Sequence, residues 1–324
     1  MNREARFARM NHSSRTPLIV STATLWVVAI VTACVSRGDK KKVDTTTSST
    51  ASAVVTPAVV SGEVDSMIPT PTVVTFASAQ TDYAQRKYGD AEQAFSAYVT
   101  RHPRNTYGHY MLGLSAWKNG DLDQARDAFE ESLALDSTNV KTLLNLSRVL
   151  LDRGEPDQAL ERIEAAVALD SGSAEVYRVR GRVESALGKR DSAEVSYRLA
   201  LSIDPSDSWS MNNLGLLLID EGRYEDALMP LALATQLRPE SPTFANNLGV
   251  ALERTGHPYS ASLAYRSALK ADSTYEKAQT SLGRVDGSMD ESPIDVAQLA
   301  QQFKQDLQTS SQVRLSAKVV KSEP

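Results

Sequence analysis

The sequence has little of what most catalytic sites and disulfide-stapled folds use. Its 324 residues contain one cysteine and four histidines, and aromatic residues make up 6% of the chain. A single cysteine excludes an internal disulfide framework and a cysteine-based zinc cluster. No two histidines stand at helical spacing, and no Ser/His/Asp set or phosphate loop is found. We therefore expect no metal, no cofactor and no enzymatic activity.

The charge of the chain limits its partners. The formal net charge is -5 at pH 7. Bulk affinity for nucleic acid needs a strongly basic face. The sequence therefore predicts a protein that does not bind nucleic acid.

The amino terminus has a basic segment followed by a long uncharged run. Four arginines within residues 1–15 precede the run 16–36, a pattern typical of a secretory signal. The run contains Val-Thr-Ala-Cys, which ends at Cys34, the only cysteine. These four residues resemble the lipobox of bacterial lipoproteins. The resemblance implies a signal peptide over residues 1–33, acylation of Cys34 and cleavage just before it.

Membrane attachment has a second interpretation. Twenty-one uncharged residues can just span a hydrocarbon core about 30 Å thick, so an uncleaved single-pass inner-membrane anchor stays open. The basic side faces the cytoplasm in either case, so most of the chain is exported. Val35 after the cysteine is not Asp, and by resemblance to lipoprotein sorting this favours the periplasmic side of the outer membrane. Residues 34–72, rich in Thr, Ser, Val, Ala and Pro, predict a disordered linker.

A repeat of 34 residues follows the linker. One glycine column contains Gly120, Gly154, Gly188, Gly222 and Gly256. A second column reads Gly113, Ser147, Gly181, Gly215, Gly249 and Gly283. A large apolar column reads Phe129, Ile163, Tyr197, Leu231 and Tyr265. Because glycine inside a helix costs about 1 kcal/mol against alanine, its return there needs a packing reason.

These columns resemble the tetratricopeptide repeat, a helix–turn–helix unit. The resemblance implies an all-α fold, an α-α superhelix, preceded by the lipoprotein signal and the flexible linker. The predicted array covers 73–287: a degenerate repeat 72–105, full repeats 106–139, 140–173, 174–207, 208–241 and 242–275, and a capping helix 276–287. A further helix over 288–308, with Ser292 as N-cap and Pro293 at its first position, predicts a second cap or a partner-binding helix. Residues 309–324 are expected to be disordered, and Pro230 to kink its helix.

By the same resemblance, the first helices line a concave groove that binds peptides. Asparagines recur on this wall at Asn145, Asn212, Asn213, Asn246 and Asn247. Their amides suit a ladder that holds a peptide backbone, or they tie neighbouring helices together. Four basic residues, Lys141, Arg148, Arg178 and Arg182, cluster on the second and third repeats, opposed there by Glu175. Such a cluster suits an acidic partner segment, or it is a solvated face. Tyr107, Tyr110, Trp117 and Trp209 are candidate anchors.

The sequence thus predicts a non-catalytic adaptor, tethered in the cell envelope, that binds extended segments of other proteins, acidic ones included. The resemblance to bacterial tetratricopeptide lipoproteins points to envelope or pilus complex assembly. Two alternatives stay open: a structural spacer that self-associates, and a regulatory or substrate-binding subunit of an envelope enzyme complex. The sequence leaves the oligomeric state open.

Overall fold

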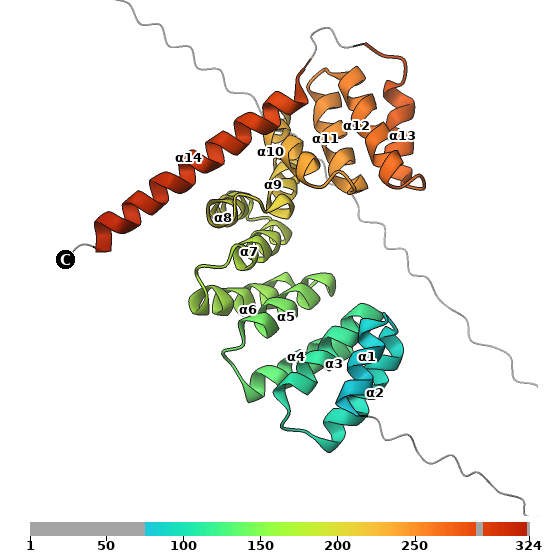
Figure 1. The fold of residues 1–324 in the computed structure, drawn as a ribbon, viewed down its shortest axis with the longest axis vertical. Helices are drawn as coiled ribbons and strands as arrows, with labels where there is room; N and C mark the ends of the chain where they lie inside the picture. The colour runs from blue at the N-terminus through green and yellow to red at the C-terminus, as the bar shows by residue number, and fades with distance from the viewer. Residues whose placement is uncertain (1–74, 290–293, 323–324) are drawn as a thin grey trace, which may run out of the picture. The chain divides into compact units, whose positions relative to one another are not determined.

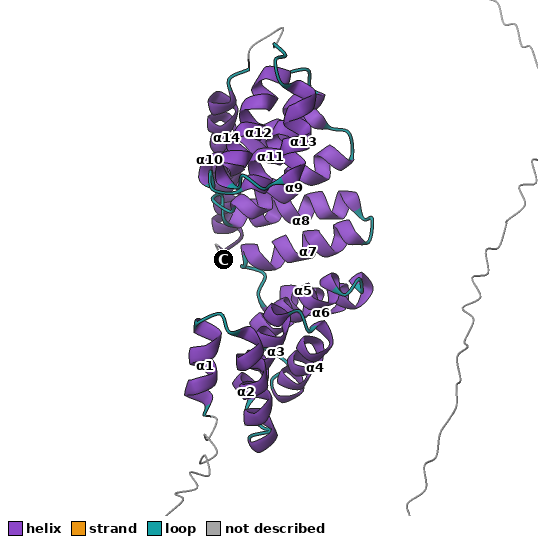
Figure 2. Ribbon diagram, turned by 90° about the vertical axis from the view of Figure 1, so that its right-hand side faces the viewer, coloured by secondary structure: helices purple, strands orange, loops and turns teal. Residues whose placement is uncertain are grey.

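The computed structural model describes residues 75–289 and 294–322 (Figures 1 and 2). Its helices are α1 (Phe76–Ala84), α2 (Tyr88–Arg101), α3 (Thr106–Asn119), α4 (Leu122–Leu135), α5 (Val140–Asp152), α6 (Pro156–Leu169), α7 (Ala174–Ala186), α8 (Arg190–Ile203), α9 (Ser208–Asp220), α10 (Tyr224–Leu237), α11 (Pro242–Arg254), α12 (Pro258–Ala271), α13 (Glu276–Val285) and α14 (Val296–Ser322). The described ranges contain no strand, so the predicted all-α class is confirmed. The signal segment 1–33, Cys34 and the linker 34–72 lie outside them. None of the described helices has the length and apolar character needed to span a membrane.

The helices follow the 34-residue period. The first helices α3, α5, α7, α9, α11 and α13 begin at Thr106, Val140, Ala174, Ser208, Pro242 and Glu276, each 34 residues after the one before. The second helices α4, α6, α8, α10 and α12 keep the same interval. From α1 to α13, each helix packs against the next one along the chain, and Figure 2 shows α7 and α8 side by side as one such pair. The structure therefore confirms the predicted solenoid of paired helices.

Within a repeat, a glycine of the first helix faces a large residue of the second. A Cβ atom added at Gly181 would lie 2.6 Å from Cε1 of Tyr197, and one at Gly249 would lie 2.5 Å from Cε1 of Tyr265. Carbon atoms normally approach to about 3.5–4.0 Å, so a side chain at either glycine would force the helices apart. Both tyrosine rings are buried. The glycine column and the large apolar column therefore recur together because they are in contact.

The other glycine column closes the turn between the two helices. Gly120, Gly154, Gly188, Gly222 and Gly256 all have φ between 71° and 91°, the left-handed conformation that favours glycine. In the degenerate repeat, Arg86 stands at the same position with a φ of 61°. A residue with a Cβ pays roughly 1–2 kcal/mol there. The turn geometry is thus kept even where the sequence departs from glycine.

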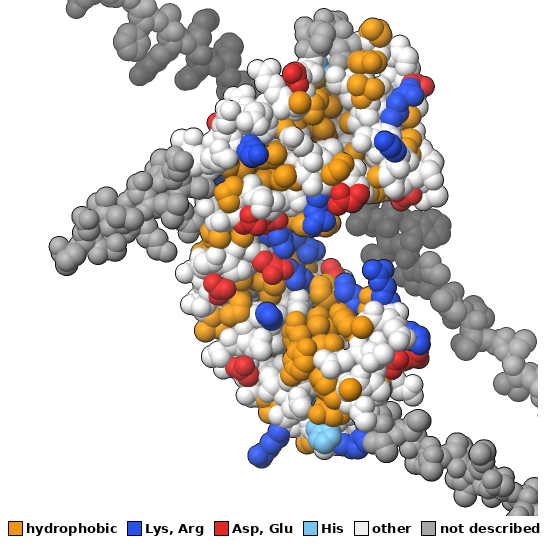
Figure 3. Space-filling model, viewed as in Figure 1, with side chains coloured by type: hydrophobic (Ala, Val, Ile, Leu, Met, Phe, Trp, Pro, Cys, Tyr) orange, Lys and Arg blue, Asp and Glu red, His pale blue; other side chains and the backbone are white. Residues whose placement is uncertain are grey.

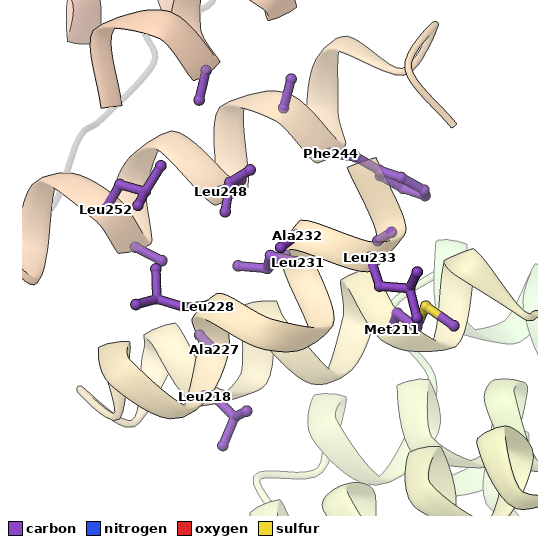
Figure 4. Close-up of a cluster of buried hydrophobic side chains, with 14 of the residues drawn as sticks. Met211, Leu218, Ala227, Leu228, Leu231, Ala232, Leu233, Phe244, Leu248 and Leu252 are labelled. Carbon is purple, nitrogen blue, oxygen red and sulfur yellow. The ribbon is translucent and has the colours of Figure 1, made fainter. Parts of the chain in front are cut away.

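Pro230 lies inside α10, which runs from Tyr224 to Leu237 without a break. The proline is buried, and Leu228 and Leu231 on either side of it are buried as well. Figure 4 shows these leucines among side chains that include Leu248 and Leu252 of α11. Pro230 has no N–H to donate, so α10 lacks one backbone hydrogen bond there. The helix nevertheless continues, and the side chains around the proline pack on neighbouring helices.

The carboxy-terminal helix begins later than the sequence predicts. Asp295 is its N-cap, since Oδ1 of Asp295 accepts the backbone N–H of Gln298 at 3.0 Å, and α14 starts at Val296. Pro293 is therefore not its first helical residue, because Ile294 and Asp295 that follow are not helical. The predicted N-cap Ser292 and Pro293 itself lie outside the described residues.

The packing and the length of α14 also differ from the prediction. It packs against α10 and α8 instead of extending the stack beyond α13 (Figure 1). Its apolar stripe, Val296, Leu299, Ala300, Phe303 and Leu307, joins the apolar cluster that contains Leu231 and Leu233 of α10. The helix continues to Ser322, whereas the sequence predicts a disordered tail from residue 309. Residues 309–322 contain neither glycine nor proline, so nothing there terminates a helix once it has formed.

Candidate functional site

The first helices of neighbouring repeats touch one another. Contacts join α3 to α5, α5 to α7, α7 to α9, α9 to α11 and α11 to α13. Among the described helices, no contact of similar extent joins successive second helices. The stack is therefore tighter on the side of the first helices. We call the exposed faces of α3, α5, α7, α9 and α11 on that side the inner wall.

Two asparagines of the inner wall bond to the preceding repeat. Nδ2 of Asn145 donates to Oη of Tyr110 at 3.1 Å, and Nδ2 of Asn247 donates to Oδ1 of Asn212 at 2.9 Å. Each bond joins residues 35 positions apart, so the sixth residue of one repeat meets the fifth residue of the repeat before it. All three asparagines are buried. Asn145, Asn212 and Asn247 therefore tie neighbouring helices together, which is one of the two roles that the sequence allowed.

The other two asparagines are placed differently. Asn246 is buried, and its Oδ1 has no hydrogen-bond partner among the described residues. Asn213 is half-buried, and its Oδ1 lies 3.5 Å from Nδ2 of Asn212. By the same spacing of 35 residues, Asn213 would pair with Arg178, but Arg178 binds Asp207 instead. Within the described part of the chain, the amide nitrogen of Asn213 makes no hydrogen bond. Asn213 therefore keeps a donor for a partner.

Two of the four predicted basic residues are already neutralised. An Arg148 guanidinium nitrogen lies 2.6 Å from Oε1 of Glu175. Arg178 donates to both carboxylate oxygens of Asp207 at 2.7 Å, and Asp207 is buried. Burial opposes the ionisation of Glu175, but Arg148 and Arg178 outweigh it and hold the pKa of this carboxyl below its usual value. These two arginines therefore serve the contacts between repeats.

Asp207 is the acid that sequence reasoning missed. It also caps α9, accepting from the backbone N–H groups of Trp209 and Ser210. It reaches Arg178 from 29 residues away because α7 and α9 are neighbours in the stack. The sequence signal is a recurring Asn, Ser or Asp just before α3, α5, α7, α9 and α11, where Asn105, Asn139, Ser173, Asp207 and Ser241 cap the helices.

Lys141 and Arg182 are exposed, and neither forms an ion pair within the described ranges. Their charges are therefore available on the inner wall. Figure 3 shows Lys and Arg side chains gathered with Asp and Glu side chains between a hydrophobic area over α3, α4 and α5 and another over α11 and α12. The charged part of this face thus lies between two apolar parts.

Aromatic side chains line the amino-terminal end of the inner wall. Tyr107 is 52% exposed and stacks on Tyr110, with ring centroids 5.9 Å apart. The ring centroids of Phe76 on α1 and Tyr107 are 5.6 Å apart, which places α1 beside the inner wall. Burial and the nearby Tyr88, Tyr110 and Tyr107 raise the pKa of Tyr83, so this hydroxyl stays protonated at neutral pH. The role of α1 in this surface was not foreseen from the sequence.

The two candidate tryptophans differ in availability. Trp209 on α9 is 46% exposed, and the guanidinium of Arg238 lies over its ring at 5.5 Å. Nε1 of Trp117 donates to Asp152 at 2.8 Å, and its ring packs on the core of the second and third helix pairs. Trp209 therefore keeps exposed area that a partner can contact, although Arg238 and Phe244 pack on its ring, whereas Trp117 is partly committed to the array.

Comparison with known proteins decides the family. Sequence models described as tetratricopeptide repeat match residues 76–140, 116–183, 174–207 and 196–229. The matched segments overlap and follow the helix pairs described above. The chain is a tetratricopeptide repeat protein. No curated protein matches it.

Several solved structures resemble this array. The APC/C hetero-tetramer Cut9–Hcn1 superimposes with a TM-score of 0.58 at 18% identity, covering 65% of this chain and 42% of that one. A tetratricopeptide repeat protein from Parabacteroides merdae gives 0.55 at 13% identity, covering 64% and 81%. MamA gives 0.44 at 26% identity, covering 51% and 97%. The first two share the fold with this chain.

Tetratricopeptide repeats are generally a non-catalytic, protein-binding fold, and this chain is accordingly a protein-interaction scaffold. Among the described residues, no group of three or more His, Cys, Asp or Glu side chains is arranged to hold a metal ion. What the inner wall offers a partner includes apolar area, the amide nitrogen of Asn213 and the charges of Lys141 and Arg182.

Proposed function

We propose that this tetratricopeptide repeat protein is a membrane-tethered adaptor whose inner wall binds an extended segment of another protein. The observation that carries the proposal is the exposure of Tyr107 and Trp209 on first helices, together with the unpaired Lys141 and Arg182 between them. Aromatic residues dominate the energetics of protein interfaces, and free cations select acidic partners.

The inner wall would recognise the partner's side chains more than the partner's backbone. Asn145, Asn212 and Asn247 are engaged within the array, so a continuous asparagine ladder is not available. Tyr107 and Trp209 lie in the first and fourth full repeats, and a chain crossing the wall could contact both. Lys141 and Arg182 lie on the repeats between them. A segment with apolar residues on each side of an acidic stretch fits this order.

Peptide selection tests this proposal. The full chain in detergent would select binders from a random peptide library displayed on phage, and synthetic binders would then be titrated by fluorescence anisotropy. We expect Tyr107→Ala and Trp209→Ala each to weaken binding about fivefold or more, the effect of a hot-spot residue. Tyr259→Ala is the matched control, because Tyr259 is also 46% exposed but lies on the second helix α12. Failure to select any binder, or equal loss in all three variants, would contradict the proposal.

We further propose that the tether is a lipid on Cys34 and that the array works in the cell envelope, on the periplasmic side of the outer membrane. The basic segment, the uncharged run and the sole cysteine at its end support this. In the native host, Cys34→Ser should move the protein from the membrane to the soluble envelope fraction. Retention of the variant in the membrane would instead support a single-pass anchor. Self-association without peptide binding would support a structural spacer.

A further inference from the structure

A small cleft opens on the inner wall between the third and fourth full repeats. It has a volume of about 260 Å³ and lies where α7, α8 and α9 meet. Its polar lining consists of Arg182, Ser185, Arg190, Tyr197, Asn213 and Asp220. A water molecule takes about 30 Å³, and pockets for drug-sized ligands take about 300–1,000 Å³. The cleft therefore has room for one side chain of a partner.

The charges of the cleft are unbalanced. Arg182 and Arg190 are both exposed, and neither forms an ion pair with another described residue. Asp220 is the one carboxylate in the lining, so the two guanidinium groups leave a net charge of +1. A charged cleft with low-dielectric walls attracts ions of the opposite sign. One monoanion would bring the lining to neutrality.

Neutral donors stand beside the two arginines. Oη of Tyr197 lies 3.4 Å from Oγ of Ser185. Burial raises the pKa of Tyr197 to about 12, so its hydroxyl keeps its proton at neutral pH. The amide of Asn213 adds a further N–H donor that no described residue uses. The cleft thus presents two guanidinium groups, which bind carboxylates strongly, together with neutral donors.

We propose that this cleft is the specificity pocket of the inner wall and that it takes the carboxylate of one Asp or Glu side chain from the bound segment. The inference rests on the proposed function and adds a defined position to it. A singly charged carboxylate balances the lining, whereas a doubly charged phosphate would leave it negative. Arg190 belongs to a second helix, so it is not among the basic residues that the sequence pointed to.

The test compares peptide selection by the wild-type full chain with selection by an Arg182→Met, Arg190→Met variant. We expect wild-type binders to share an Asp or Glu at one aligned position, and the variant to select binders without it. The matched control is Arg198→Met, which removes a positive charge from α8 outside the cleft. Binders that lack a shared acid, or an acid that the variant still selects, would refute the pocket. The absence of any binder would instead count against the proposed function.

A second measurement identifies the recognised group. In a synthetic wild-type binder, changing the shared Glu to Gln should weaken binding to the wild type about tenfold, the size of a charge-assisted contact. The same peptide change should have little effect on binding to the double variant, because the two changes remove the same interaction. Phosphoserine in place of Glu should bind more weakly than Glu. Tighter binding of phosphoserine would overturn the carboxylate assignment.

Discussion

Replacing Gly181 by alanine tests whether close helix contact accounts for the recurring glycine. The new Cβ would lie 2.6 Å from Cε1 of Tyr197, roughly 1 Å inside normal carbon contact. The Tyr197 ring is 3% exposed, so the packed side chains around it resist a shift of that size. Overpacking of this kind costs about 1–3 kcal/mol. Alanine regains about 1 kcal/mol of helix propensity, so we expect a net loss of up to about 2 kcal/mol.

Gly283→Ala is the matched control. Gly283 occupies the same repeat position in α13, but no second helix follows it, and a Cβ there meets nothing within 4 Å. The propensity gain is then unopposed, and we expect about 1 kcal/mol of stabilisation. The two identical substitutions should therefore differ by the overpacking cost alone, about 1–3 kcal/mol.

Urea unfolding of the full chain, followed by far-ultraviolet circular dichroism, measures both variants. Because repeat arrays can unfold in parts, amide hydrogen exchange in α7 and α8 should be read as well. Equal stability of the two variants would refute the contact explanation. The second repeat supplies a rescue, since there Ser147 stands opposite Ile163. Gly181→Ser and Tyr197→Ile together would copy that pair. Adding Tyr197→Ile should therefore restore part of the stability that Gly181→Ser alone loses.

Three further predictions concern single residues. Arg86→Gly should raise the thermal midpoint, because it relieves about 1 kcal/mol of left-handed strain; an unchanged midpoint would argue against strain there. Arg178→Met should cost about 3–5 kcal/mol in urea unfolding, because it leaves the buried Asp207 without its ion-pair partner, whereas Lys141→Met should change stability little. The pKa of Glu175 is lowered in the folded state, so its contribution is present above the unfolded pKa and is lost as pH falls through the lower, folded one. Glu175→Gln should therefore lose less stability than the wild type on acidification, and parallel losses would contradict this.

The inner wall was only partly predictable. The repeat positions of Asn145 and Asn247 could be read directly, because a fixed period places each residue on a known face. Whether their amides turn to a peptide or to a neighbouring helix depends on the residue 35 positions earlier, and that pairing became visible only with the helices in contact. Arg190 was missed for the same reason. It lies on a second helix, and only the packing of α8 beside α7 and α9 brings it to the cleft.

The sequence by itself determined the period and the helix pairs, because these depend on local features: glycine in a left-handed turn, small residues facing large ones, and apolar residues at helical spacing. Only the tertiary structure decided where α14 lies. Its apolar stripe required a partner, but a stripe of Val, Leu, Ala and Phe fits any apolar surface of suitable shape. In the structure α14 packs on the apolar surface of α10, next to α8. The sequence could not predict this, because the hydrophobic effect is non-directional and depends only on the area buried and the fit of the surfaces.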